Sequence, residues 1–297
     1  MSQTILVYGA TGPQGRPVAE RLLAAGHRVR VLARKPAAAS ALAAKGAQVV
    51  EGDLTRPETL LAASRGVDAI SLFVPFLDPN PDYGLAALEA ARTAGVRRIV
   101  WNPTGPIPPA STGNPGMDVR RIVFEKLSVP GAFDYVVLQP TAYLENFLMP
   151  ALVAELRKTS TFAYPMPPTS AMQWICHDDV AQFAVEAFNR PTVKNTVFDV
   201  SGPESLTGDQ IAVRMTAGLG RPIEFRAMPP AEFGSVLDAA YGPGAGARVV
   251  PFYEALFASP ALFSSSVDLS IALEALPVKS TNVEQWSRTH ASLLSPL

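Results

Sequence analysis

The chain has 297 residues, 48% of them hydrophobic, which is enough to bury a large core in one domain or in two closely joined domains. Its 25 lysines and arginines nearly balance 26 aspartates and glutamates, and the net charge of −1 argues against direct binding to nucleic acid or to an anionic membrane. One cysteine excludes an internal disulfide, and three scattered histidines do not form a metal-ligand cluster, so we expect no bound metal. The sequence shows neither a signal peptide nor an apolar run of membrane-spanning length, which predicts a cytoplasmic protein, monomeric or homodimeric, with a small-molecule substrate.

The first predicted unit is a buried strand at residues 4–8 that runs through a glycine-rich turn into a helix ending near residue 25. Three glycines spaced three apart have separate physical uses in such a turn: a sharp bend, close approach of the backbone to a pyrophosphate, and close packing of helix on strand. The pyrophosphate then rests on free N–H groups at the positive end of the helix dipole. The alternative is a glycine-rich turn that holds no ligand. The residues predicted to hold a dinucleotide in this loop are Gly9, Thr11, Gly12, Pro13, Gln14 and Gly15.

Strands and helices continue to alternate as far as residue 150. The further strands are expected at residues 28–33, 48–51, 69–74, 98–101 and 135–138. Helices are expected between them, because each strand is followed by a segment with helical patterning. This order predicts an α/β fold, with residues 1–150 forming a doubly wound parallel-sheet Rossmann domain.

The second half, residues 151–297, predicts a smaller, mostly helical substrate domain or lid. Aromatic-rich helices are expected at residues 233–241 and 248–257, and prolines mark the loops around them. The segment from about residue 175 to residue 201 is expected to return to the Rossmann sheet through a strand at 196–200.

Three threonines predict the starts of helices. Thr55, Thr207 and Thr281 are each followed three residues later by a glutamate or a glutamine, which is the spacing of a capping box.

The end of the second strand indicates which dinucleotide binds. In this fold an acidic residue there accepts from the ribose 2′-hydroxyl, whereas a basic residue holds a 2′-phosphate. The sequence has Arg34 and Lys35 at this point and no acid, which favours NADP(H) over NAD(H), and Arg16 can reach the same phosphate. The alternative is a solvated basic turn. Asp53 and Leu54 follow the third strand and are predicted to flank the adenine, although Asp53 has the alternative role of capping the next helix.

Several motifs together resemble one family. They are Gly-Ala-Thr-Gly-Pro-Gln-Gly at 9–15, Arg34, Glu-Gly-Asp-Leu at 51–54, Gln-Pro-Thr-Ala-Tyr-Leu-Glu-Asn-Phe at 139–147, Ile-Cys-His-Asp-Asp-Val-Ala at 175–181 and Phe-Asp-Val-Ser-Gly-Pro at 198–203. The chain is similar over nearly its whole length to the NmrA-like group of atypical short-chain dehydrogenases/reductases. This resemblance implies a Rossmann domain that binds NADP(H) and a small C-terminal domain. Members of the group include quinone and phenylpropanoid reductases, and also regulators that bind the dinucleotide without turnover.

The catalytic residues of the wider superfamily are only partly present. None of the seven tyrosines has a lysine four residues on, so the Tyr-x-x-x-Lys pair that protonates a carbonyl oxygen is missing. Where relatives carry a lysine one turn before a glutamate, this chain has Arg121, which can hold a ribose hydroxyl or an oxyanion but is a poor proton donor. Thr104 or Asn102 stands where the superfamily places a serine, and loop structure alone is an equal alternative for both.

The remaining proton donors are Tyr143, Tyr83, His177 and water, and the residues predicted to be catalytic are Tyr143, Arg121 and Thr104. The consecutive residues 176–178, Cys-His-Asp, point in different directions and cannot form a relay among themselves, so we interpret Asp178 as a helix cap.

The predicted pocket is mainly aromatic, which suits a flat or apolar substrate such as a quinone, an enone or a phenolic compound. The alternative is that many of these aromatic side chains are ordinary core. Val74 and Pro75 are predicted to contact the cofactor, and the substrate residues are Phe76, Tyr143, Asn146, Phe147 and Trp174, with Phe162 and Tyr164 nearby. The sequence thus favours an NADPH-dependent reductase, with a redox-sensing NADP(H)-binding regulator as the main alternative and an isomerase or hydratase with a retained cofactor as a weaker one.

Overall fold

The computed structural model describes residues 2–75, 79–260 and 266–296. Its contacts divide the chain into two compact units. Unit 1 comprises Met1–Pro140, His177–Val200 and Leu269–Lys279, and unit 2 comprises Thr141–Cys176, Ser201–Asp268 and Ser280–Leu297. The first division therefore falls before residue 150, and a short segment near residue 270 also belongs to unit 1.

Unit 1 is built on a seven-stranded sheet in the order β10-β6-β5-β4-β1-β2-β3. All neighbouring strands pair in parallel. The strands are β1 (Thr4–Val7), β2 (Arg28–Ala33), β3 (Gln48–Glu51), β4 (Ala69–Phe73), β5 (Arg98–Asn102), β6 (Asp134–Pro140) and β10 (Thr196–Val200). This topology confirms the predicted doubly wound fold, including the return of the segment at 196–200 to the sheet beside β6.

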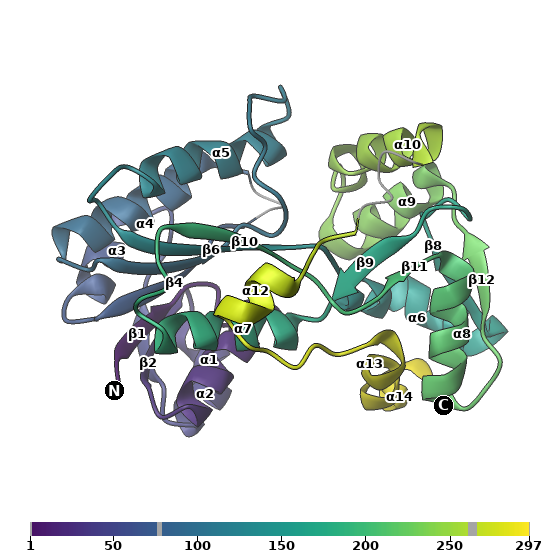
Figure 1. Cartoon of the computed structure of the whole chain (residues 1–297), viewed down its shortest axis with the longest axis horizontal. Coiled ribbons are helices and arrows are strands. Elements are labelled where there is room, and N and C mark those ends of the chain that lie inside the picture. The colour runs from purple at the N-terminus through teal and green to yellow at the C-terminus, as the bar shows by residue number, and fades with distance from the viewer. Residues whose placement is uncertain (1, 76–78, 261–265, 297) are drawn as a thin grey trace. The chain divides into compact units, whose positions relative to one another are not determined.

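Helices cover both faces of this sheet, as Figure 1 shows for α3, α4 and α5 on one side and α1 and α7 on the other. The helices of unit 1 are α1 (Gly15–Ala24), α2 (Ser40–Ala44), α3 (Pro57–Ser64), α4 (Pro81–Thr93), α5 (Pro115–Leu127), α7 (His177–Asn189) and α12 (Ser270–Ala275), with a 3-10 turn, η1 (Pro36–Ala39). Apolar side chains of β4, β5 and β6 pack with those of α3, α4 and α5 in one buried cluster. Because both faces are covered, the middle residues of the central strands are mainly apolar, as in Ile99, Val100 and Trp101 of β5.

Unit 2 contains helices together with two small sheets. The order β11-β9-β7 joins β7 (Ala142–Tyr143), β9 (Met172–Ile175) and β11 (Ser205–Leu206), and β8 (Thr161–Tyr164) pairs in parallel with β12 (Glu224–Ala227). The helices are α6 (Pro150–Thr159), α8 (Gly208–Leu219), α9 (Pro230–Tyr241), α10 (Val250–Ala258), α13 (Val283–Thr289) and α14 (Ala291–Leu294), with 3-10 turns η2 (Leu144–Leu148) and η3 (Gly246–Arg248). Its core is rich in aromatic rings, with Phe147 touching four others.

The predicted helix caps have mixed outcomes. Thr207 and Gln210 form the expected capping box at the start of α8. The prediction for Thr55 is wrong, because α3 begins one residue later with Arg56 at the cap, and the Thr55 hydroxyl bonds to Asp53. The prediction for Thr281 is displaced by one residue, since Asn282 and Gln285 make the capping box of α13.

Candidate functional site

The glycine turn after β1 has the backbone geometry that its spacing predicts. Gly9 has φ +66°, a left-handed conformation that side chains other than glycine adopt only with strain. The Gly12 N–H donates to the Gly9 carbonyl at 2.9 Å and closes the turn. A Cβ on Gly15 would lie 2.4 Å from the Gly9 oxygen, so the first turn of α1 packs directly on the end of β1. Gly15 therefore serves the close packing of helix on strand.

The amino-terminal end of α1 suits an anion. Its first turn contains no acidic residue, and Gln14 at the cap makes no side-chain hydrogen bond to the helix N–H groups. Backbone N–H groups and the helix dipole at such an end favour negative charge. Pro13 is exposed and Thr11 is half-buried on the same loop.

Exposed cations lie beside this turn at the carboxyl end of β2. Arg34 and Lys35 directly follow the strand, and Arg16 lies in the first turn of α1. In the part of the chain that the structure describes, the side chains of Arg34 and Arg16 make no hydrogen bond or ion pair, although the side chains of most other arginines do. A guanidinium without a protein partner is available to bind an anion.

Asp53 is held in a turn at the neighbouring end of β3. Its carboxylate accepts from the N–H and the hydroxyl of Thr55, both at 2.9 Å. The backbone hydrogen bond from Thr55 lowers the pKa of Asp53 most, and the nearby Arg34 charge also lowers it. Asp53 does not cap α3, because Arg56 occupies the cap position. The other role predicted for Asp53, to flank the adenine together with the half-buried Leu54, stays a prediction.

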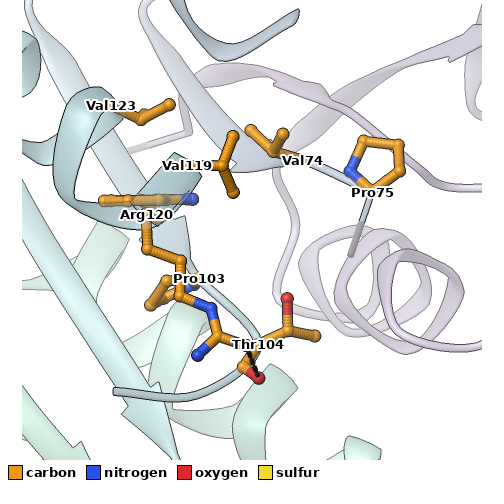
Figure 2. A pocket seen from close by; sticks show the side chains of 8 residues that line it. Val74, Pro75, Pro103, Thr104, Val119, Arg120 and Val123 are labelled. Carbon is orange, nitrogen blue, oxygen red and sulfur yellow. Dashed lines mark hydrogen bonds between the residues drawn. The ribbon is translucent and has the colours of Figure 1, made fainter. Parts of the chain in front are cut away.

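The ends of β4 and β5 enclose a small cavity with one face of α5 (Figure 2). Its lining includes Val74, Pro75, Thr104 and Arg120. The volume of about 10 Å³ is on the scale of one water molecule. Thr104, one of the predicted catalytic residues, therefore lies within unit 1 at the carboxyl edge of the sheet, where ligands of open α/β sheets bind.

Sequence reasoning missed Arg120, which contacts the loop after β5. Its Nη2 donates to the Thr104 carbonyl at 3.3 Å and its Nη1 donates to the Pro106 carbonyl at 3.1 Å. Arg121, the predicted residue, instead pairs with Glu125 on the same helix. The helical spacing of the sequence could have identified Arg120, because this residue lies on the same buried face of α5 as Val123 and Leu127, three and seven residues later.

The residues predicted to contact the substrate belong to unit 2, except Phe76, which lies outside the described residues. Tyr143 is 7% exposed, and Phe147 and Trp174 are each 2% exposed with ring centroids 4.6 Å apart. Phe162 and Tyr164 pack in the same aromatic cluster. Asn146 is half-buried and donates to the Tyr164 hydroxyl at 3.4 Å. Phe147 and Trp174 thus contribute to the core of unit 2, and their role toward a substrate stays a prediction.

The residues 176–178 lie at the start of a helix. The helix α7 begins at His177, so Asp178 lies inside the first turn, where its carboxylate pairs with Arg21 of α1; the prediction that it caps the helix is wrong. Burial lowers the pKa of His177 to about 4, which leaves the ring neutral near pH 7 and poorly suited to act as an acid. Tyr83, another candidate donor, is half-buried on α4.

None of the helices in the described residues has the length and apolar character needed to cross a membrane. Nor do these residues contain a group of three or more histidine, cysteine, aspartate or glutamate side chains that could hold a metal ion.

The parallel sheet, with its glycine turn at the carboxyl end of β1, defines a Rossmann-type α/β protein. The NmrA-like family model matches residues 1–286, and the chain belongs to the NmrA-like family. This result confirms the resemblance seen in the motifs.

Named relatives include enzymes and a regulator. The chain is 32% identical over 228 residues to an NAD(P)H azoreductase of Xenophilus azovorans, covering 75% of this chain and 77% of the relative. Among solved structures, Citrobacter sp. triphenylmethane reductase complexed with NADP(H) has a TM-score of 0.78 at 21% identity, covering 97% of this chain and 99% of that one. NmrA, a negative transcriptional regulator in complex with NADP, has a TM-score of 0.75 at 18% identity, covering 97% and 94%. These structural matches support the same fold.

Proposed function

We propose that this protein is an NADPH-dependent reductase that transfers hydride to a small apolar or aromatic carbonyl compound, quinone or enone. The observation that carries the proposal is the glycine turn into α1 together with the partnerless Arg34 guanidinium beside it. The first turn of α1 has no acidic residue and no side-chain cap, and the Arg34 side chain makes no hydrogen bond or ion pair within the described residues. A dinucleotide with a 2′-phosphate satisfies both features.

The residues of unit 1 fit the successive parts of such a cofactor. The loop from Gly9 to Gly15 would hold the pyrophosphate, and Arg34, with Lys35 and Arg16, would hold the 2′-phosphate. Asp53 and Leu54 flank the adenine, and Val74 and Pro75 continue the site along the carboxyl edge of the sheet. When bound, the nicotinamide supplies the hydride, and the protein supplies orientation and a dry surface.

At the reacting end, the proposal assigns to Thr104 the donation of a hydrogen bond to the substrate oxygen. The proton that the substrate oxygen needs on reduction would come either from Tyr143 or from water. Arg121 stabilises developing negative charge, which a guanidinium does without losing its proton. Asn146, Phe147 and Trp174 provide the aromatic and amide groups of the substrate side.

The relatives support an oxidoreductase. One is named an NAD(P)H azoreductase and another a triphenylmethane reductase, and triphenylmethane is an aromatic compound. These names agree with the aromatic character of unit 2. They do not select one substrate among carbonyl compounds, quinones and enones.

A second candidate function is an NADP(H)-binding redox sensor that regulates without turnover. The missing Tyr-x-x-x-Lys pair favours it, as does the structural likeness to NmrA, a transcriptional regulator. Both candidates require the same cofactor site.

The test is a panel of quinones, enones and aryl ketones incubated with NADPH and followed by the loss of absorbance near 340 nm, with NADPH binding measured by calorimetry in parallel. Consumption of NADPH with one of these acceptors supports the reductase. Tight binding without consumption across the panel supports the sensor. Absence of binding to both NADPH and NADH would falsify both.

A further inference from the structure

The loop after β5 contains a threonine in an uncommon backbone conformation. Thr104 has φ +62°, in the left-handed region that β-branched residues rarely adopt. Among the described residues its hydroxyl has no hydrogen-bond partner, and the side chain is half-buried. Such outliers persist only where surrounding contacts fix them, and they cluster at functional sites.

Two side chains hold this turn through its backbone. The Asn102 carboxamide oxygen accepts from the Thr104 N–H at 2.8 Å. The Arg120 guanidinium, 6% exposed as a residue, reaches from α5 to the Thr104 carbonyl, as the dashed line in Figure 2 shows. It also binds the carbonyl of Pro106. Both peptide groups of Thr104 are therefore bonded, one to each side chain.

The backbone between these carbonyls lies close against the guanidinium. Gly105 has φ +140°, and a Cβ there would lie 3.0 Å from Arg120 Nη1 and 3.3 Å from Cζ. A glycine at this position allows the turn to close around the guanidinium. Lysine has one ammonium in place of the planar fork and cannot reproduce two divergent bonds in fixed directions.

The same asparagine links the turn to the glycine loop. The Asn102 Nδ2 group donates to the Gln14 carboxamide oxygen at 3.1 Å, and Gln14 occupies the cap position of α1. A continuous chain of hydrogen bonds thus runs from Gln14 through Asn102 and the Thr104 backbone to Arg120.

We infer that Asn102 and Arg120 are positioning residues, which fix the direction of the Thr104 hydroxyl and align it with a cofactor held in the glycine loop. The inference rests on the proposed function, because it assigns the Thr104 hydroxyl to the substrate. Arg120 bonds to the carbonyls of Thr104 and Pro106 in the turn and to Met117 on its own helix, whereas Asn102 bonds to both the turn and the glycine loop. Their replacement therefore has different kinetic consequences.

The first experiment compares Arg120→Met and Arg120→Lys with Arg92→Met, an exposed arginine paired with Glu89 on α4. Displacing a hydrogen-bond donor by about 1 Å can lower turnover roughly 100-fold, so we expect kcat of Arg120→Met to fall about 10- to 100-fold. The dissociation constant of NADPH from this variant is expected to stay within about twofold of the wild-type value, because the substitution removes no hydrogen bond from the proposed cofactor site. Deuterium at C4 of NADPH should give a larger isotope effect in this variant. Arg92→Met should match the wild type.

The Lys variant separates positioning from charge. Arg120→Lys keeps the positive charge, so a kcat as low as that of Arg120→Met supports the need for the planar fork. A kcat equal to that of the wild type in both variants overturns the proposal. Loss of kcat and of NADPH affinity in equal proportion also overturns it, because that result indicates general damage to the fold.

The second experiment is a double-mutant cycle with Asn102→Ala, followed both by NADPH binding and by thermal unfolding. Asn102→Ala should weaken NADPH binding severalfold, on the order of one hydrogen bond, and lower kcat as well. Because both side chains hold one turn, the shifts in melting temperature should be non-additive. Additive shifts overturn the network even if the wild type proves inactive, so failure of the reductase proposal and failure of this one are distinguishable.

Discussion

Replacing Arg34 by glutamate tests the physical basis of the cofactor site. One charge-assisted hydrogen bond to the 2′-phosphate contributes about 1.5 kcal/mol at an exposed site, the lower end of the usual range. The new carboxylate also repels the phosphate by about 1 kcal/mol at a separation near 4 Å in water. Together these effects amount to about 2.5 kcal/mol, which corresponds to a roughly 70-fold weaker NADPH complex. NADH lacks the phosphate and should lose nothing.

The assay is calorimetric titration of both dinucleotides into wild type and Arg34→Glu. The matched control is Arg65→Glu, since Arg65 is also exposed but precedes β4 and so lies at the opposite, amino edge of the sheet. The preference of Arg65→Glu for NADPH over NADH should equal that of the wild type. The preference of the wild type should also shrink as salt is added, because exposed charges are screened. An unchanged NADPH-to-NADH ratio in Arg34→Glu would refute the assignment of the 2′-phosphate to this arginine.

Three further changes test the structure around the site and in the core. Gly15→Ala places a Cβ 2.4 Å from the Gly9 oxygen, so it should lower the free energy of unfolding by about 1–3 kcal/mol in urea titration and weaken cofactor binding; equal stability would contradict the packing. Tyr253→Phe removes one of two hydrogen-bond partners of the buried Tyr164 hydroxyl, the one at 2.8 Å, and leaves Asn146; it should cost about 1–3 kcal/mol, whereas replacing both tyrosines by phenylalanine should cost less than the two single changes added together. Hydrogen bonds from Thr112 and neighbouring groups lower the pKa of Asp118 to about 2. The ionised Asp118 carboxylate should therefore stabilise the fold fully above the ordinary aspartate pKa, and this stabilisation should disappear as pH falls toward 2. The difference in melting temperature between wild type and Asp118→Asn should vanish over the same pH range. A difference that stays constant with pH would contradict the reasoning.

Local sequence determined the elements of unit 1 closely. The strands at 28–33, 48–51 and 196–200 lie where their short runs of β-branched and apolar residues predict them. Gly9 and Gly15 also have the turn and packing roles that their spacing indicates. Helix starts were less certain, as at Asn282, because several neighbouring polar residues can supply a cap and the approach of the chain selects one.

The class of protein and the position of its glycine turn followed from the sequence alone, since both depend on local backbone preferences and on apolar periodicity. Tertiary structure decided which of two adjacent arginines serves the β5 loop. Successive helix residues point about 100° apart, so only the packing of α5 directs Arg120 to Thr104 and leaves Arg121 with Glu125. Tertiary structure likewise placed Phe147 among four other rings, because an aromatic residue has the same sequence signal in a core as in a pocket.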